Sequence, residues 1–402
     1  MKGKTRHDFI YRTLWIFLRH FIARKFNFKY KVIKAIRPPY IVISNHLTNW
    51  DPILIGLSFG RSMYYVATDQ IFRMGLKSKI LLYFFSPIVR AKTTQETQTI
   101  RTMFSRLKDN CNICIFAEGM TSFDGETCEI QPSIGKLVKR AGVTLVTYRF
   151  TGSYFTFPRW ARFIRRGKME GNPVQIYNPD KIASMTKEEI YEAIKKDLSV
   201  SAYAEQKKNP VVYRGKNRAE YLETVLYCCP KCRQFGVLTS RGDLLSCACG
   251  FQARFNELNY FEIPNSREDE APFKTITDWI RWQRNEVKML AGALNDMDAN
   301  VPVFTDLGQR LYEVQSAAGS ALVADGKLCL YKDRLSLIPC EGGVSGKPFD
   351  FPFDTIIEMS CFAMMRILFS TNKNKVFEIH SKHPRSALKY MDFFKIIKPV
   401  KG

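Results

Sequence analysis

The sequence has no apolar run long enough to cross a bilayer as a helix, which needs about 20 consecutive apolar residues. The best candidates, Leu14–Leu18 and Ile80–Val89, are each followed directly by an arginine. The start of the chain also lacks a charged segment followed by an apolar stretch and a small-residue cleavage site. We therefore expect no spanning helix and no secretory signal.

Acidic residues are scarce relative to basic ones, with 38 Asp and Glu against 61 Lys and Arg, a net charge of +23. This imbalance predicts an acidic partner, such as anionic lipid, phosphate groups, nucleic acid or an acidic carrier protein. General disorder is excluded because 46% of the residues are hydrophobic and 13% are aromatic. A length of 402 residues favours two or three domains.

A disulfide framework is also missing, although the chain has eleven cysteines. Five of them lie between Cys228 and Cys249, and the others are scattered through apolar segments. We expect reduced thiols and a cytosolic environment.

Residues 5–26 are predicted to form a helix with one apolar face, because apolar residues recur there at steps of three and four. The segment Met1–Tyr40 carries eleven Lys or Arg against the single acidic residue Asp8. A basic helix with Trp and Phe is typical of one that lies flat on an anionic membrane. The alternative is a first helix that packs on its own domain, and the two can hold together. The expected apolar face consists of Phe9, Ile10, Leu14, Phe17, Leu18, Phe21 and Ile22.

The next part of the chain alternates short apolar runs with helical segments, which predicts an α/β fold with a mostly parallel sheet flanked by helices. Asp51-Pro52 is a start signal for a helix over Ile53–Phe59, with Asp51 as its N-cap. We expect this domain to cover residues 1–220. The predicted strands are Tyr40–Ile43, Tyr64–Ala67, Asn112–Phe116 and Val143–Phe150.

His46 and Asp51 form the first candidate for catalysis. His46 follows the carboxyl end of a predicted strand, the edge at which open α/β sheets bind ligands. A turn could bring Asp51 onto the imidazole and fix its tautomer, so that His46 could take a proton from a hydroxyl. The alternative is that Asp51 serves only as a helix cap.

Two further features lie at the same predicted edge. The strand Asn112–Phe116 is followed by Glu118 and Gly119, and the apolar run through Val89 ends in Arg90. A guanidinium can bind two oxygens of a phosphate, so Arg90 is a candidate phosphate ligand. Its alternative is a solvated arginine after a buried run.

In this order the motifs resemble those of the 1-acylglycerol-3-phosphate acyltransferase family, which includes lysophosphatidate and glycerol-phosphate acyltransferases. The resemblance covers about residues 1–220. The family's Asn-His-x-Ser-x-x-Asp block corresponds to Asn45, His46, Thr48 and Asp51, with Thr in place of Ser. Its second block ends in an arginine, here Arg90. The third, Phe-Pro-Glu-Gly-Thr-Arg-Ser, corresponds to Phe116–Ser122, and the fourth to Ala141-Gly142-Val143 without the family's prolines.

The resemblance implies transfer of a fatty acyl group from an acyl thioester, acyl-CoA or acyl-ACP, to the hydroxyl of a lysophospholipid. The expected acceptor is 1-acylglycerol-3-phosphate, and the expected product is phosphatidate. The enzyme would be a peripheral or monotopic protein at the cytoplasmic face of the cell membrane. His46 would be the general base oriented by Asp51. The residues implied in substrate binding are Asn45, Thr48, Arg90, Glu118 and Gly119.

One departure from the family pattern concerns the acceptor's phosphate. The third-block arginine is replaced by Thr121, so one expected phosphate contact is missing. Either another cation compensates or the acceptor differs. The candidate cations are Arg90, Lys92, Lys136 and Arg149.

A zinc ribbon is predicted over residues 221–262. Cys229 and Cys232 are separated from Cys247 and Cys249 by fourteen residues, and four thiolates suit a structural Zn²⁺. The second pair is closer than usual, since Ser246 occupies the expected position, and Cys228 is a spare candidate. The alternative is a small hairpin with four buried thiols, which so short a segment could hardly stabilise without metal.

Residues 263–402 are predicted to form a helix, Ile276–Leu294, and a small β-rich domain that ends in the helix Ser386–Ile397. The order of these elements is vaguely similar to pleckstrin-homology or GRAM-type modules, and a plain packing domain is the alternative. For the whole chain, the alternative is an inactive or non-enzymatic zinc-ribbon protein that binds a membrane or nucleic acid. Nucleic acid is disfavoured because no RNA- or DNA-reading motif is present.

Overall fold

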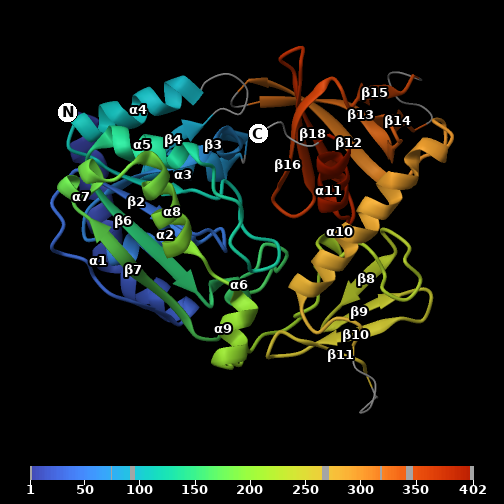
Figure 1. Cartoon of the computed structure of the whole chain (residues 1–402), viewed down its shortest axis with the longest axis horizontal. Coiled ribbons are helices and arrows are strands. Elements are labelled where there is room, and N and C mark those ends of the chain that lie inside the picture. Colours follow the sequence, from blue (N-terminus) through green and yellow to red (C-terminus); the bar gives the residue numbers. More distant parts are fainter. Residues whose placement is uncertain are drawn as a thin grey trace. The chain divides into compact units, whose positions relative to one another are not determined.

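The computed structural model describes residues 2–73, 75–90, 96–264, 271–316, 319–340 and 347–398 (Figure 1). The chain divides into two compact units, Met1–Arg159 with Phe163–Gly215, and Trp160–Arg162 with Lys216–Gly402. The predicted boundaries of three domains, 1–220, 221–262 and 263–402, stay predictions.

The first unit is built on a seven-stranded sheet in which every pair is parallel except β6 with β7. The prediction of an α/β fold with a mostly parallel sheet is therefore confirmed. In sheet order the strands are β1 (Phe28–Tyr30), β7 (Met169–Tyr177), β6 (Thr144–Thr151), β2 (Tyr40–Ser44), β5 (Asn112–Phe116), β3 (Met63–Thr68) and β4 (Ile88–Arg90).

Strand β2 lies at the centre of this sheet, paired with β5 and β6, and all five of its side chains are buried. A strand covered on both faces reads as a continuous apolar run, which is why Tyr40–Ile43 could be recognised. Ser44 at its end is level with Phe116 of β5 and Tyr148 of β6. The residues that follow β2 and β5 therefore leave the sheet at one edge.

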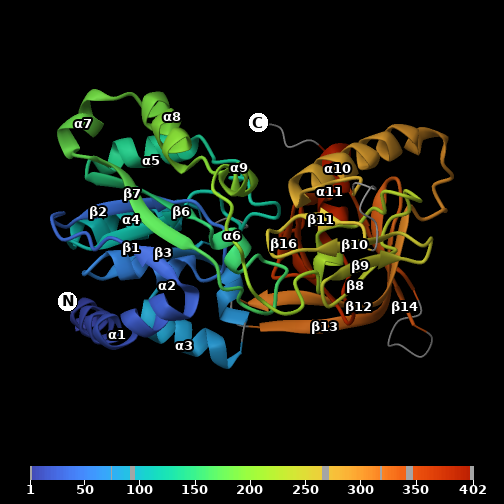
Figure 2. The same ribbon diagram turned by 90° about the horizontal axis from the view of Figure 1, so that it is seen from below.

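Helices cover both faces of this sheet, as Figure 2 shows, with α1, α2 and α3 on one side and α5, α7 and α8 on the other. The main core joins α4, α5, α7 and α8 to one face through Ile, Leu, Val and Met side chains. The helices are α1 (Lys2–Phe26), α2 (Asp51–Ser58), α3 (Leu76–Phe85), α4 (Glu96–Lys108), α5 (Ser133–Ala141), α6 (Ser153–Thr156), α7 (Pro179–Ser184), α8 (Lys187–Leu198) and α9 (Ala202–Lys208), with a 3₁₀ turn at Asp69–Arg73.

Helix α1 packs on the unit with part of the predicted apolar face, since Ile10, Leu14 and Ile22 are half-buried. Its inner side also makes hydrogen bonds, from Tyr11 and Trp15 to backbone carbonyls of α2 and of Phe59, and between His7 and the carbonyl of Met63 in β3. Phe9, Phe17 and Phe21 face outward instead, with exposed fractions of 70%, 74% and 66%. The helix therefore packs on its domain and also displays apolar side chains.

The second unit contains two antiparallel sheets, so the predicted β-rich character of the C-terminal region is confirmed. The four-stranded sheet has the order β11 (Phe261–Glu262), β10 (Gln252–Phe255), β9 (Leu244–Cys247) and β8 (Leu238–Arg241). The seven-stranded sheet has the order β15 (Phe349–Pro352), β14 (Arg334–Pro339), β13 (Gly319–Leu330), β12 (Phe304–Ser316), β18 (Val376–Ser381), β17 (Arg366–Thr371) and β16 (Ile356–Phe362).

Two helices complete the second unit, α10 (Ile276–Gly292) and α11 (Ala387–Ile397), with 3₁₀ turns at Leu222–Thr224 and Ala293–Asp296. Asp392 of α11 accepts a hydrogen bond from the Tyr227 hydroxyl and forms an ion pair with Arg284 of α10. Asp306 of β12 is bonded by Lys389 of the same terminal helix. Helix α11 is therefore held to β12, to α10 and to the segment that precedes the four-stranded sheet.

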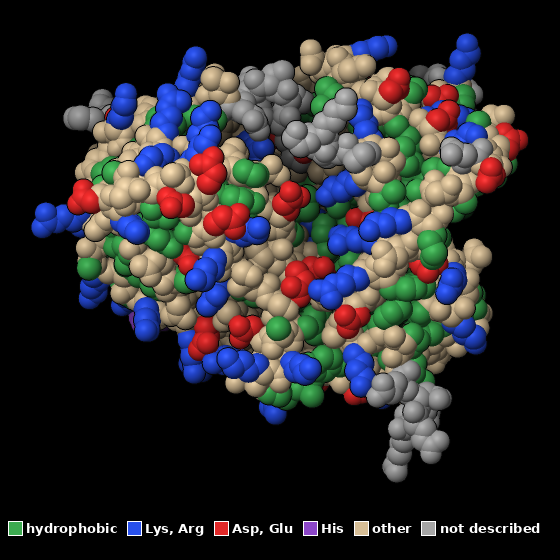
Figure 3. Space-filling view, in the orientation of Figure 1, with side chains coloured by type: hydrophobic (Ala, Val, Ile, Leu, Met, Phe, Trp, Pro, Cys, Tyr) green, Lys and Arg blue, Asp and Glu red, His purple; other side chains and the backbone are tan. Residues whose placement is uncertain are grey.

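Basic side chains are spread over the molecule. Figure 3 shows Lys and Arg on both units, with Asp and Glu among them, on the face in view. Residues 1–40 account for +10 of the total, from eleven basic residues and Asp8, and the other residues carry the rest of the +23. In the described part of the chain, no helix is both long and apolar enough to span a membrane.

Candidate active site and cysteine cluster

The turn between β2 and α2 brings His46 and Asp51 together. His46 Nδ1 lies 3.0 Å from Asp51 Oδ2. Because an ionised carboxylate only accepts hydrogen bonds, a neutral imidazole bonded to it carries its proton on Nδ1 and presents a lone pair at Nε2. The imidazole stacks on Phe116, the last residue of β5, with ring centroids 4.4 Å apart.

Asp51 is fully buried, and Oδ2 also accepts the backbone N–H groups of Leu47 at 2.7 Å and Thr48 at 2.9 Å. Burial raises the pKa of Asp51, whereas His46 and these two amides pull that pKa downward. The carboxylate therefore fixes both the backbone of the turn and the orientation of the imidazole.

The prediction that Asp51 caps helix α2 is wrong. Asp51 is the first residue of α2, the N-cap position is Trp50, and no side chain caps the helix. Because the carboxylate points back into the β2–α2 turn, it bonds Leu47 and Thr48 rather than the free N–H groups of the helix. Capping therefore does not explain the aspartate at this position.

The side chain of His46 is 17% exposed, whereas that of Asp51 is fully covered. Among the described residues, Nε2 of His46 has no hydrogen-bond partner. Nε2 is therefore accessible at the carboxyl edge of the sheet, and the hydrogen bond between Nδ1 and Asp51 sets the tautomer of the ring.

Glu118 ties the third motif to the histidine turn. Its Oε1 accepts the backbone N–H of His46 at 2.7 Å, and Oε2 accepts that of Cys128 at 2.6 Å. Burial raises the pKa of Glu118 to about 8, against an ordinary value of 4.5. A second link is the bond from Ser122 N–H to the His46 carbonyl, at 3.0 Å. The loop after β5 therefore holds the His46 backbone from two sides.

Asn45 and Thr48 also bond to the site's own backbone. The amide of Asn45 donates to the carbonyl of Phe150 at 3.1 Å and accepts its N–H at 2.8 Å, which joins β2 to β6. The Thr48 hydroxyl accepts the N–H of Trp50 at 3.2 Å. Both side chains are fully buried, so their predicted contacts with substrate stay predictions.

Gly119 and Arg90 lie at the same edge of the sheet as His46. Gly119 has φ +69°, a left-handed conformation that side chains disfavour, so the turn after Glu118 requires glycine there. Arg90 ends β4 with its side chain exposed, three strands from β2. At about 4.8 Å between strands, this separation is about 14 Å across the sheet. A single small group could not contact both His46 and the start of the Arg90 side chain.

Arg159 is a cation that the sequence patterns did not single out. Its guanidinium donates to the carbonyl of Thr121 at 3.0 Å and stacks on Phe123, 3.9 Å from the ring centroid. It therefore lies beside the residue that replaces the family arginine. The basic and aromatic character of Arg149–Trp160 was the available signal, but nothing in the sequence indicated this pairing.

Three other cations were considered in place of that arginine: Lys136, Arg149 and Lys92. Lys136 is exposed on α5, and Arg149 of β6 donates to the carbonyl of Ser199. Lys92 lies outside the described residues.

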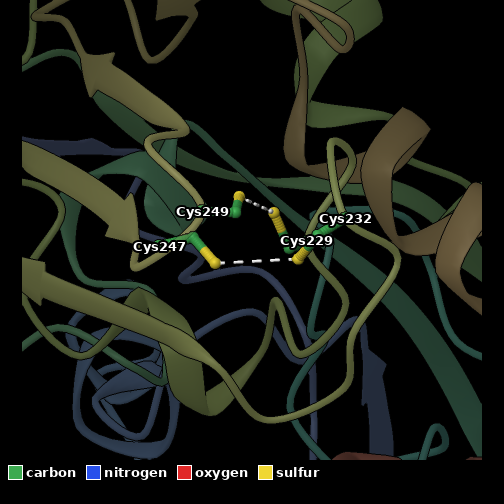
Figure 4. Close-up of side chains that lie close together, drawn as sticks. All are labelled: Cys229, Cys232, Cys247 and Cys249. Atoms are coloured by element: carbon green, nitrogen blue, oxygen red, sulfur yellow. Dashed lines mark hydrogen bonds between the residues drawn. The ribbon is translucent and has the colours of Figure 1, made fainter.

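The four predicted metal ligands come together in the second unit. Figure 4 shows Cys229 and Cys232 facing Cys247 and Cys249. The Sγ atoms of Cys229 and Cys249 are 3.7 Å apart, those of Cys232 and Cys247 are 3.8 Å apart, and all four lie within 4.8 Å of one another. The spare candidate, Cys228, is buried and directs its thiol to the carbonyl of Arg233.

Comparison with known proteins gives matches in the part of the chain that holds the His46 turn. Residues 25–151 match the model of the Acyltransferase family. A curated protein of Mycoplasma genitalium, "Probable 1-acyl-sn-glycerol-3-phosphate acyltransferase", is 24% identical over 141 residues, 34% of this chain and 48% of that protein. This chain therefore matches about half the length of that relative.

A solved structure, the 1-acyl-sn-glycerophosphate acyltransferase PlsC from Thermotoga maritima, superposes with a TM-score of 0.40. The superposition covers 49% of this chain and 81% of that one, at 18% sequence identity. The chain thus contains a segment, residues 25–151, that matches the Acyltransferase family and includes His46, Asp51, Arg90 and Glu118.

Proposed function

We propose that this chain transfers a fatty acyl group from an acyl thioester, acyl-CoA or acyl-ACP, to the hydroxyl of a lysophospholipid. The observation that carries the proposal is the His46–Asp51 pair, which is 3.0 Å apart and leaves Nε2 accessible at the carboxyl edge of the sheet. The match of residues 25–151 to the Acyltransferase family supports it. The expected product is a phospholipid.

In the proposed reaction, His46 Nε2 takes the proton of the acceptor hydroxyl as its oxygen attacks the thioester carbonyl carbon. The C–O bond forms, the C–S bond breaks, and the thiol leaves with the proton that His46 returns. Asp51 keeps Nδ1 protonated and stabilises the imidazolium that forms in between. The amide of Asn45 is occupied by Phe150, so an N–H of the backbone is the better candidate for the oxyanion.

The acceptor that we propose is 1-acylglycerol-3-phosphate, giving phosphatidate. The description of the Mycoplasma genitalium relative favours this acceptor. Arg90, exposed at the same edge of the sheet, is the proposed phosphate ligand. Because the phosphate and the free hydroxyl of this acceptor are on adjacent carbons, the Arg90 side chain would have to span most of the distance to His46. Arg159, beside Thr121, adds a second guanidinium near the third motif.

We further propose that α1 binds an anionic membrane surface. Phe9, Phe17 and Phe21 point away from the protein, and basic residues alternate with them along the helix. Helix α3 adds the exposed Leu76, Ile80 and Tyr83, and Arg6 of α1 stacks on Tyr83 at 5.2 Å. Exposed apolar groups with surrounding basic charge are typical of helices that lie in a lipid interface.

The experiment that tests the proposed activity uses purified full chain with acyl-CoA and acyl-ACP donors and a panel of lysophospholipids. Thiol release and the acylated lipid are measured in the same reaction. We expect both products in equal amounts with at least one lysophospholipid. Thiol release without acylated lipid would indicate a thioesterase, and neither product with any donor and acceptor would favour the non-enzymatic alternative.

A further inference from the structure

We propose that Cys229, Cys232, Cys247 and Cys249 bind one structural Zn²⁺, and that this ion holds together the segment on which α10 and α11 are fixed. The inference concerns the second unit only and is independent of acyl transfer. It is carried by the geometry of the four sulfur atoms and by the contacts of the residues next to Cys229.

The spacing of the sulfur atoms fits tetrahedral zinc. With Zn–S bonds of about 2.3 Å, the sulfur atoms of a regular tetrahedron are about 3.8 Å apart. The pairs Cys229–Cys249 and Cys232–Cys247 have separations of 3.7 and 3.8 Å. A disulfide would bring the two sulfur atoms to about 2.05 Å, so neither pair is disulfide-bonded and all four thiols are free to act as ligands.

The identity of the fourth ligand follows from the two turns. Gly250, with φ +86°, closes the second turn through a bond from its N–H to the Cys247 carbonyl, which lets Cys249 face the first pair despite the shorter spacing. Cys228 points to the Arg233 carbonyl and pairs with Phe235 in a β-bridge, so its thiol is directed elsewhere. The ligand set is therefore Cys229 and Cys232 with Cys247 and Cys249.

Four bound thiolates leave the centre closed, without a position for water or substrate, which is the arrangement of structural zinc. Zn²⁺ with four thiolates carries a net charge of −2. Lys231 lies between the first two ligands in the sequence. Its Nζ is 3.7 Å from the position that a Cβ on Gly250 would occupy, so a positive charge lies next to the second turn. No carboxylate or histidine joins the group within the described residues.

The residues just before Cys229 are the anchor for the two helices of this unit. Trp279 of α10 donates to the Cys228 carbonyl at 2.9 Å, and Gln283 accepts the Tyr227 N–H at 2.9 Å. The Tyr227 hydroxyl donates to Asp392 of α11 at 2.9 Å. The four-stranded sheet itself has a small core, and Trp279 packs on Phe251 and Phe261 to extend it. A metal that fixes Cys229 would therefore also fix these helix contacts.

The test measures metal by mass spectrometry in full chain purified without chelators, together with the reactivity of its thiols. We expect about one zinc per chain, and four fewer thiols that react under native conditions than after removal of the metal. Cys249→Ser should lower the zinc content at least about tenfold after dialysis against a chelator. Cys228→Ser is the matched control, since it removes the neighbour of a ligand, and it should keep its zinc.

Three results would overturn the proposal: full zinc content in Cys249→Ser, loss of zinc in Cys228→Ser alone, or iron in place of zinc. If Cys249→Ser fails to fold, the wild-type chain still decides the question. Removal of zinc from it should expose the four thiols and increase proteolysis within Lys216–Gly402, and readdition of Zn²⁺ should reverse both. A wild-type chain that holds no zinc, and whose thiols do not respond to added Zn²⁺, would also overturn the proposal.

Discussion

Asp51 Oδ2 receives three hydrogen bonds, and the one from His46 Nδ1, at 3.0 Å, joins the carboxylate to the proposed base. The other two come from the backbone of the turn between them. One buried oxygen therefore sets the backbone, the tautomer and the ring orientation of the site.

Replacement of Asp51 by Asn should lower kcat by about two to four orders of magnitude. An amide NH₂ at this position would face N–H donors, and the imidazole would lose the acceptor that keeps its proton on Nδ1. The measurement is steady-state transfer to the best lysophospholipid. Asp180→Asn, on the exposed start of α7, is the control and should behave as wild type. Equal activity of both variants would remove Asp51 from the mechanism.

Glu118 gives a prediction that separates positioning from substrate binding. Both carboxylate oxygens are bonded to backbone N–H groups, of His46 and Cys128. Ionised Glu118, the form that predominates above about pH 8, accepts both bonds, whereas in Glu118→Gln the amide NH₂ would face one of these donors, so transfer is compared above that pH. We expect kcat to fall, because the His46 backbone shifts, with little change in the KM for the acceptor. A large rise in that KM with unchanged kcat would instead indicate that Glu118 binds substrate.

The same residue predicts a pH dependence of stability. Burial raises the pKa of Glu118 to about 8. Between about pH 4.5 and 8, the folded chain keeps a proton that the unfolded chain loses, so folding becomes less favourable as pH rises. The free energy of unfolding of wild type, relative to Glu118→Gln, should fall by roughly 1–4 kcal/mol across this range. Urea unfolding at several pH values measures it, and a difference that grows with pH would show the opposite shift in pKa.

The membrane proposal predicts that Phe17→Ser with Phe21→Ser weakens binding to vesicles of phosphatidylcholine and phosphatidylglycerol at least about tenfold. Both side chains are exposed, so the fold should be unaffected. Co-sedimentation is the measurement, and binding by wild type should also weaken as salt rises. Phe163→Ser, 51% exposed and outside α1 and α3, is the matched control. If the control loses as much binding as the double variant, α1 is not the contact surface.

The sequence predicted the α/β fold because buried parallel strands are short apolar runs that polar turns interrupt. Tyr40–Ile43 and Asn112–Phe116 are of this kind, and the structure extends the first by one residue only. The C-terminal sheet was harder to predict. The strands expected there were Lys327–Tyr331, Arg334–Ile338, Thr355–Ser360, Met365–Ser370 and Lys375–His380, and none of them covers β12 or β15. In β12 the buried positions Asp306 and Gln309 are polar, Leu307 is exposed and the register shifts, so the apolar alternation that predicts a strand is broken.

For the site, spacing predicted the meeting of His46 and Asp51 but not what the other motif residues contact. Asn45 bonds to Phe150, more than a hundred positions away, and Glu118 bonds to the backbone of His46. Such contacts depend on how strands are ordered in the sheet, which no local pattern specifies. The periodicity of α1 left open whether its apolar side chains meet a membrane or the protein. The contacts that hold the helix to the unit are made in part by polar atoms at the tips of the Tyr11 and Trp15 rings, which the periodicity of apolar residues does not indicate.

The most direct test of the account is the transfer activity of His46→Ala, measured alongside its circular dichroism and unfolding midpoint. The imidazole is partly exposed, and its hydrogen bond is to the Asp51 side chain rather than to the backbone, so the variant should fold. The account predicts a loss of acyl transfer of at least about a hundredfold, while His20→Ala, an exposed histidine of α1, keeps full activity. A folded His46→Ala chain with turnover near wild type would contradict it.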